Sequence, residues 1–277
     1  MAGMLYLVPT PIGNLGDISR RMAETLEKVD FIAAEDTRVT LRLLNHMELK
    51  KPLMSYYRHN TGEAGRQVLD RLLGGENGAL VTDAGTPAVS DPGEELVALC
   101  AENGVEVVAI PGPCALVTAL SVSGLPTARF TFEGFLPMNR KNRRTLLETL
   151  KGEERTMIFY EAPHKLSATL EDLAGAFGGE RRISLCRELT KLHEEVYRTT
   201  LAGAVERYQT EPPRGEFVLV VEGAYPQETE PVSLEDGLER VAVLQGDGVS
   251  RKDAVKQAAK ELGLARNELY SAALKAE

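Results

Sequence analysis

The stretch at residues 81–93, Val-Thr-Asp-Ala-Gly-Thr-Pro-Ala-Val-Ser-Asp-Pro-Gly, constrains the fold of this chain more than any other. The apolar run at 79–81 is typical of a buried strand, and residues 94–100 that follow the stretch have helical spacing with two acids in the first turn. The stretch is therefore predicted to be a loop between the carboxyl end of a strand and a helix. In an open α/β sheet, small ligands bind at such loops.

The residue types in this loop favour a ligand site. Gly85 allows the backbone to approach a ligand closely, and two prolines stiffen the turn. The remaining positions are rich in short polar side chains, namely Thr82, Asp83, Thr86, Ser90 and Asp91. The alternative is an ordinary strand-to-helix turn in which Asp91 caps the helix.

A second loop of this kind lies near the N-terminus. Residues 4–8 form a short apolar strand, residues 9–17 form a loop rich in glycine and proline, and a helix follows with Ser19 near its cap. Gly13 and Gly16 do not complete the Gly-x-Gly-x-x-Gly fingerprint, and the chain contains no phosphate-loop motif. Neither NAD nor ATP is favoured as a ligand.

The chain as a whole predicts an α/β protein. A third strand–loop–helix unit spans residues 105–123, so a doubly wound parallel sheet is the simplest arrangement for the first part. The segment 126–134 is expected to cross into a second α/β domain, with a helix at 199–208. We expect an N-terminal domain at 1–118, a second domain at 119–225, and a linker with a small helical module at 226–277.

Composition limits the possible functions. The chain has 277 residues, 43% of them hydrophobic and 26% charged, as in a globular protein of two domains. Three separated cysteines and four scattered histidines suggest neither a disulfide framework nor a metal site. No signal-peptide pattern or apolar run of membrane length occurs, so we expect a cytoplasmic protein. The formal charge of -9 argues against general nucleic-acid affinity, but it allows a local basic patch.

Such a patch is predicted at residues 140–144, where four cations occur in five residues at the start of a helix. The alternative is simply a solvated helix start. The lysines at 252, 256 and 260 recur at helical spacing and either bind phosphate or form a soluble face. Tyr56 and Tyr57 precede a basic residue, a composition suited to stacking on bases, and the alternative is a polar loop after a strand.

Taken together, the loops resemble the tetrapyrrole-methylase superfamily of S-adenosylmethionine-dependent methyltransferases. Within it they are most similar to the branch that methylates the ribose 2'-hydroxyl of a cytidine in 16S ribosomal RNA of the small subunit, in its decoding region. The segments that carry the resemblance are TPIGNL at 10–15 with DIS at 17–19, AEDTR at 34–38, DAGTPAVSDPG at 83–93, IPGP at 110–113, RELTK at 187–191 with EE at 194–195, and GEF at 215–217.

The resemblance implies two α/β domains with S-adenosylmethionine bound in the cleft between them, and a homodimer. By position, it assigns the donor contacts to Pro11, Asp83, Ala84, Gly85, Thr86, Ala88, Cys114, Ala115, Tyr160, Glu161 and Leu189. The tetrapyrrole enzymes carry Gly-Gly-Asp-Pro where this chain has residues 83–86, and Gly-Pro-Gly-Asp where it has residues 10–13. These departures favour an RNA substrate over a tetrapyrrole.

A neutral ribose hydroxyl is a poor nucleophile, so a base or a cation near the developing oxyanion should assist the reaction. The candidate bases are Asp36, Glu161 and Glu188, and the candidate stabilising cations are Arg38 and Lys191. The candidate RNA-binding residues are Arg38, Arg140, Lys141, Arg143 and Arg144. Two alternatives remain: a methyltransferase acting on a small tetrapyrrole, and a non-catalytic protein that binds the ribosome.

Overall fold

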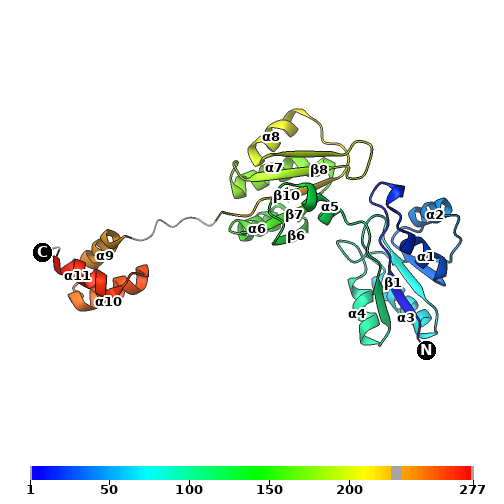
Figure 1. Cartoon of the computed structure of the whole chain (residues 1–277), viewed down its shortest axis with the longest axis horizontal. Coiled ribbons are helices and arrows are strands. Elements are labelled where there is room, and N and C mark those ends of the chain that lie inside the picture. The colour runs from blue at the N-terminus through cyan, green and yellow to red at the C-terminus, as the bar shows by residue number, and fades with distance from the viewer. Residues whose placement is uncertain (1, 226–232, 276–277) are drawn as a thin grey trace. The chain divides into compact units, whose positions relative to one another are not determined.

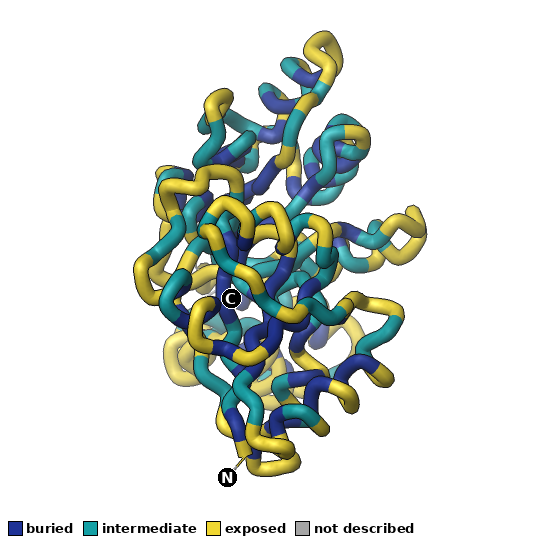
Figure 2. Tube along the Cα trace, turned by 90° about the vertical axis from the view of Figure 1, so that its right-hand side faces the viewer, coloured by how far each residue is buried: buried dark blue, intermediate teal, exposed yellow. Residues whose placement is uncertain are grey.

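The computed structural model describes residues 2–225 and 233–275. Contacts divide the chain into two compact units, Met1–Ala224 and Tyr225–Glu277. None of the described helices is long and apolar enough to span a membrane. Buried residues, dark blue in Figure 2, alternate along the chain with intermediate ones in teal and exposed ones in yellow.

The first sheet of the larger unit is entirely parallel, with the strand order β3-β2-β4-β1-β5. Its strands are short, and the central pair β2 and β4 is buried on both faces, as in a sheet covered by helices on each side. The strands are β1 (Met4–Leu7), β2 (Phe31–Ala34), β3 (Leu53–Ser55), β4 (Gly78–Val81) and β5 (Glu106–Ala109). The predicted parallel sheet is confirmed.

Four helices pack against this sheet, two in each of the two cores that flank it, and Figure 1 shows them beside its strands. One core joins the strands to α1 (Arg20–Lys28) and α2 (Thr37–His46), and another joins them to α3 (Thr61–Leu73) and α4 (Glu94–Glu102). The neighbouring strands β1 and β4 are followed by α1 and α4, which lie on opposite faces. The loops after β1 and β4 therefore diverge at a topological switch point, where open α/β sheets bind ligands.

The second sheet is mixed, with the order β6-β7-β10-β8-β9. Only β6 and β7 are parallel, and the other pairs are antiparallel. Its strands are β6 (Phe130–Phe135), β7 (Thr156–Glu161), β8 (Arg182–Arg187), β9 (Glu195–Thr200) and β10 (Phe217–Val221). One face packs against three helices, α6 (Arg140–Leu150), α7 (Leu166–Phe177) and α8 (Leu201–Thr210).

The other face of the second sheet packs against α5 (Ala115–Val122) through Leu116, Ala119 and Leu120. The predicted domain division at residue 118 lies inside this helix. Because α5 packs on the second sheet, we propose that the second α/β domain begins with α5. No other described helix covers this open face, and Ile12, Val89 and Cys114 from the loops of the first sheet pack against it. Two short helical turns, η1 (Leu15–Asp17) and η2 (Pro163–Lys165), complete the larger unit.

Two details of the sequence prediction were wrong. The expected crossover at 126–134 contains the edge strand β6, and the helix expected at 199–208 begins only at Leu201, after β9. Thr200 accounts for the second difference, because its side chain accepts a hydrogen bond from the backbone of Gly203 and so begins the helix there. Edge strands such as β6 and β9 are half-buried, which weakens the hydrophobic pattern by which strands are found.

The smaller unit has its own apolar core, formed by three helices, α9 (Leu234–Gly246), α10 (Arg251–Leu262) and α11 (Arg266–Lys275). Ser250 caps α10 by accepting from the backbone of Asp253, and Gly263 ends the helix in the left-handed conformation with φ of 68°. The predicted linker at 226–232 lies outside the described residues.

Candidate functional site

The loops after β1 and β4 are joined at the switch point by a short antiparallel bridge. The backbone N–H of Thr10 donates to the carbonyl of Gly85 at 2.9 Å, and the N–H of Gly85 donates back at 3.0 Å. The Thr10 hydroxyl also donates to the carbonyl of Thr82 at 3.0 Å. Gly85 adopts a φ of +89°, a backbone conformation that favours glycine. The conformation at the bridge therefore explains why this residue is a glycine.

The loop at 111–114 joins the same assembly. The Thr86 hydroxyl donates to the carbonyl of Pro113 at 2.9 Å. A side chain at Gly85 would place its Cβ 3.4 Å from Ile12 and 3.8 Å from the Pro113 carbonyl oxygen. Asp91 does not cap α4, because the cap position is Gly93 and no side-chain cap bond is present there. The alternative of an ordinary capped turn is therefore rejected.

A cavity of about 500 Å³ lies between these loops and the open face of the second sheet. The first half of the larger unit contributes Ile12, Glu35, Thr82, Asp83, Ala84, Gly85, Thr86, Val89, Ser90, Asp91, Cys114 and Ala115. The second half contributes Phe135, Tyr160, Glu161, Ala162, Pro163, Cys186, Leu189, Glu216, Phe217 and Val218. The cavity is thus enclosed by both sheets, as the resemblance implied.

The charge of the cavity wall has one sign. Five carboxylate residues line it, Glu35, Asp83, Asp91, Glu161 and Glu216, and within the part of the chain that the structure describes no lysine, arginine or histidine does. Burial, followed by the negative charge of Glu35, raises the pKa of Asp91 to about 6 and also raises the pKa of Asp83. Such a wall suits a cationic ligand and disfavours a phosphate.

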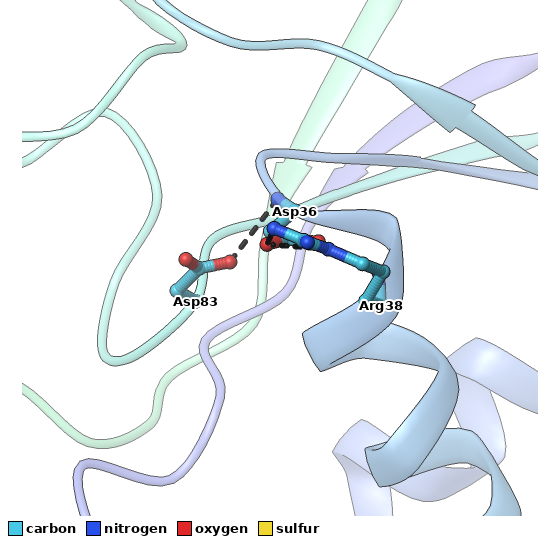
Figure 3. Close-up of polar contacts among 3 residues, drawn as sticks. All are labelled: Asp36, Arg38 and Asp83. Atoms are coloured by element: carbon cyan, nitrogen blue, oxygen red, sulfur yellow. Dashed lines mark hydrogen bonds and ion pairs between the residues drawn. The ribbon is translucent and has the colours of Figure 1, made fainter.

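Asp36 and Arg38 lie beside this wall rather than in it. The Arg38 guanidinium donates to both carboxylate oxygens of Asp36, the shortest bond being 2.6 Å, and the Asp36 backbone N–H donates to Asp83 Oδ1 at 3.1 Å (Figure 3). Asp36 also caps α2. The hydrogen bonds from Arg38 lower the pKa of Asp36 to about 2, so Asp36 is a weak base.

Tyr160 and Glu161 end β7 at the other side of the cavity. The Tyr160 hydroxyl oxygen accepts from the backbone N–H of Leu116 at 3.1 Å, and burial raises the pKa of Tyr160 to about 12. The Glu161 side chain is buried and accepts from the Ala162 N–H at 2.8 Å and from the Thr169 hydroxyl at 2.5 Å. Glu161 is therefore already bonded within its own domain.

Glu188 and Lys191 form a small ion cluster next to the cavity. Lys191 Nζ donates to Glu188 Oε1 at 2.9 Å and to Glu216 Oε2 at 2.8 Å. The hydrogen bond from Lys191 is the main cause that lowers the pKa of Glu188. Partial burial opposes charging of Lys191, but the two carboxylates outweigh it and raise its pKa. Of these three residues, Glu216 lines the cavity.

The same cluster touches the first loop. Asn14 donates a side-chain hydrogen bond to the Thr190 carbonyl at 3.3 Å, and a Cβ on Gly13 would lie 2.5 Å from Cγ of Lys191. Gly13 has a φ of +151°, so close approach and backbone conformation both require glycine here. The two halves of the larger unit are thereby in direct contact at one edge of the cavity.

Most residues that the resemblance assigned to the donor line the cavity. They are Asp83, Ala84, Gly85, Thr86, Cys114, Ala115, Tyr160, Glu161 and Leu189. Ala88 does not line it, and Pro11 lies in a neighbouring smaller hollow with Leu15, Thr40 and Asp83. Glu35, Phe135 and Val218 also line the cavity although no sequence pattern assigned them to it, and Asp91, predicted only as a loop residue or cap, lines it as well. Glu35 and Asp91 belong to segments that carried the resemblance, whereas Phe135 had no sequence signal.

The cations at the start of α6 divide into two groups. Arg140, Lys141 and Arg144 are exposed. Arg143 instead pairs with Asp172 of α7 at 2.6 Å, and the two side chains are only 15% and 17% exposed. Arg143 therefore ties α6 to α7.

The two tyrosines at 56–57 also differ in burial. Tyr56 is 1% exposed and belongs to the core between the first sheet and α3, so its predicted role as a stacking partner is wrong. Tyr57 is exposed.

The chain belongs to the family of tetrapyrrole (corrin/porphyrin) methylases, whose model matches residues 4–205. Its sequence is 49% identical over 275 residues to a Synechocystis protein named ribosomal RNA small subunit methyltransferase I, with 99% of each chain covered. It is 45% identical to the Escherichia coli O157:H7 protein of the same name, covering 98% of this chain and 95% of the relative.

Solved structures agree on the fold. Cobalt precorrin-4 methyltransferase aligns with a TM-score of 0.59 at 17% identity, covering 79% of this chain and 94% of the other. Diphthine synthase aligns with a TM-score of 0.61 at 14% identity, covering 79% and 90%. At these identities the likeness establishes the two-sheet fold alone.

Proposed function

We propose that this protein transfers a methyl group from S-adenosylmethionine to the 2'-hydroxyl of a cytidine ribose in the 16S ribosomal RNA of the small subunit, in the decoding region. The observation that carries the proposal is the near full-length similarity to relatives named for methylation of that RNA. The carboxylate-rich cavity and the exposed cations of α6 support it independently.

The donor fits the residues of the cavity. S-adenosylmethionine carries a sulfonium cation and a neutral adenosine, and when bound it supplies an electrophilic methyl group. The carboxylates of Asp83 and Asp91 provide the opposite charge, and the bridge at Gly85 exposes backbone at close range. Val89, Leu189 and Val218 provide apolar surface for the adenosine. A phosphorylated cofactor would face only like charges on this wall.

The proton of the ribose hydroxyl needs an acceptor. Asp36, Glu161 and Glu188, the three bases expected from the sequence, are all engaged by strong hydrogen-bond donors in the structure. Asp91 lines the cavity, and burial together with the negative charge of Glu35 raises its pKa to about 6, so this carboxylate can accept a proton near neutral pH. We propose Asp91 as the base. Lys191 stays protonated and, through Glu216, holds the rim of the cavity.

We prefer an RNA acceptor to a tetrapyrrole acceptor because Arg140, Lys141 and Arg144 are exposed at the start of α6 and can bind phosphates. These cations follow Phe135, which lines the cavity, by only a few residues. A tetrapyrrole methyltransferase would be indifferent to reversal of those charges. A non-catalytic ribosome-binding protein would bind the subunit but not the donor. We also propose a homodimer, which sedimentation of the purified protein tests.

Methyl transfer from radiolabelled S-adenosylmethionine to small ribosomal subunits tests the function. The subunits are taken from cells that lack this protein, and nuclease digestion locates the label. Label on a cytidine ribose is the expected result. Donor binding without label on the subunit would favour a small-molecule acceptor, and absence of donor binding in calorimetry would favour the non-catalytic alternative. Parallel reactions with naked RNA identify which form is the substrate.

A further inference from the structure

The edge strand β6 contains a bulge that changes the direction of an aromatic side chain. Its pairing with β7 passes from Phe132 opposite Ile158 to Gly134 opposite Phe159, so Glu133 is an extra residue. Gly134 supplies the positive φ of 64° that the irregularity requires. Bulges are rare in parallel pairs, and near active sites they redirect side chains.

The consequence is an aromatic cluster on the open face of the second sheet. In a regular strand, residues three apart point to opposite faces. Because of the extra residue, Phe132 and Phe135 both lie against Tyr160, with ring centroids 4.9 Å and 5.7 Å away and interplanar angles of 65° and 69°. Phe135 is thereby held in an edge-to-face contact that fixes its ring at the cavity.

Phe135 is the outermost member of this cluster. It lines the cavity, yet 56% of the residue is exposed, whereas Phe132 and Tyr160 are half-buried. A small donor held beside Asp83 and Leu189 lies among enclosing loops. A ring that is more than half exposed at the mouth is instead accessible to a larger molecule arriving from solvent.

Positively charged residues follow Phe135 closely in the sequence. Met138, three residues on, is 81% exposed, and Asn139 caps α6 by accepting from the backbone N–H groups of Lys141 and Asn142. Arg140 and Lys141 follow, both exposed. An exposed aromatic ring followed by cations matches the way proteins hold single-stranded nucleic acid, with bases stacked on rings and phosphates on basic side chains.

We propose that Phe135 is the platform on which a base of the acceptor RNA stacks at the mouth of the cavity, so that the ribose of that nucleotide is presented to the interior while α6 holds the adjoining phosphates. Phe135 is thus a positioning residue for the acceptor. The proposal rests on the proposed function, since it assumes an RNA acceptor, and it deepens that function by naming the acceptor subsite.

Kinetics of Phe135→Ala test this role. Removing one base–aromatic stack should raise the KM for small subunits between about 5-fold and 150-fold. The affinity for S-adenosylmethionine, measured by calorimetry, should change less than twofold. Phe135→Trp should restore the KM, because tryptophan also stacks. The matched control is Phe130→Ala at the far end of the same strand, which is 40% exposed, does not line the cavity and should leave the KM unchanged.

A second measurement separates stacking from structural effects. An oligoribonucleotide spanning the methylated nucleotide is compared with the same strand lacking the base of that nucleotide, and binding is followed by fluorescence anisotropy. Loss of the base should weaken binding to the natural protein and leave binding to Phe135→Ala unchanged. Equal losses in both proteins would overturn the proposal, as would a Phe135→Ala defect confined to donor affinity. If the natural protein methylates no RNA, the proposed function fails instead.

Discussion

At the scale of single residues, the raised pKa of Asp91 makes the proposed binding of S-adenosylmethionine depend on pH. A cation binds the ionised carboxylate, and the pKa of about 6 means that Asp91 is charged above pH 6 and neutral below it. The affinity for S-adenosylmethionine should therefore fall as pH decreases through 6, by up to about tenfold per unit for one coupled proton. Calorimetry between pH 5 and 8 measures this dependence, and binding below pH 6 should be accompanied by proton release into the buffer.

Asp91→Asn should remove most of that pH dependence and weaken binding at pH 7.5. Glu94→Gln is the control, because Glu94 is exposed in the first turn of α4 and does not line the cavity. An unchanged pH profile in Asp91→Asn would show that Asp83 or Glu35, which also line the cavity, carries the dependence instead.

A second prediction for a single residue concerns the stability of the protein when Gly85 is replaced. Gly85→Ala places a Cβ at a φ of +89° and 3.4 Å from Ile12, so we expect a loss of about 1–2 kcal/mol in the free energy of unfolding, together with weaker donor binding. Urea denaturation measures the loss. Gly104 has a φ of +67° with open space around it. Gly104→Ala should therefore lower the free energy of unfolding through backbone strain alone and leave the affinity for S-adenosylmethionine unchanged. Gly152→Ala, in open space without positive φ, should be nearly neutral.

At the scale of elements, α6 holds a residue that ties it to α7, Arg143, next to the exposed cations that we propose bind RNA. Arg143→Ala should lower the free energy of unfolding by about 1–3 kcal/mol, because Asp172 would be left mostly buried without its partner. Thermal or urea unfolding measures this change. The variant should keep its affinity for RNA at temperatures where it is folded, and a loss of RNA affinity without loss of stability would contradict the assignment.

In contrast to Arg143→Ala, Arg140→Glu should weaken RNA binding and leave stability almost unchanged. Its side chain is exposed at the N-terminal end of α6, so we expect little change in stability, weaker binding to small subunits, and a shallower dependence of that binding on salt by about one unit of the logarithmic slope. Lys151→Glu is the matched control, since Lys151 caps the other end of the same helix and is also exposed. Equal effects of the two reversals would indicate a general charge effect instead of a site.

The elements also show what could be predicted from the sequence. Buried strands such as β2 and β4 are continuous apolar runs followed by glycine- and proline-rich loops, so the first sheet and its ligand loops followed from local patterns. The edge strands β6 and β9 were missed because they are only half-buried. The bulge at Gly134 depends on pairing with β7, and the partners of Arg143 and Glu161 come from α7. Such long-range contacts leave no trace in local composition.

At the scale of the whole molecule, the smaller unit has an apolar core of its own. Val255, Ala258 and Leu269 contribute to that core, while Lys256 and Lys260 are exposed on α10. We propose that this unit presents the two lysines to RNA, while the cavity is lined, among the residues that the structure describes, only by residues of the larger unit.

Reversing both charges, Lys256→Glu with Lys260→Glu, should therefore lower the affinity for small subunits and reduce the salt dependence of binding by about two units of the logarithmic slope. Donor affinity and kcat at saturating subunit concentration should stay unchanged, because neither lysine lines the cavity. Filter binding at several salt concentrations measures the slope, and circular dichroism checks that the helices remain folded. An unchanged slope would mean that the lysines serve only solubility, leaving α6 and Phe135 of the larger unit as the RNA contacts to be tested.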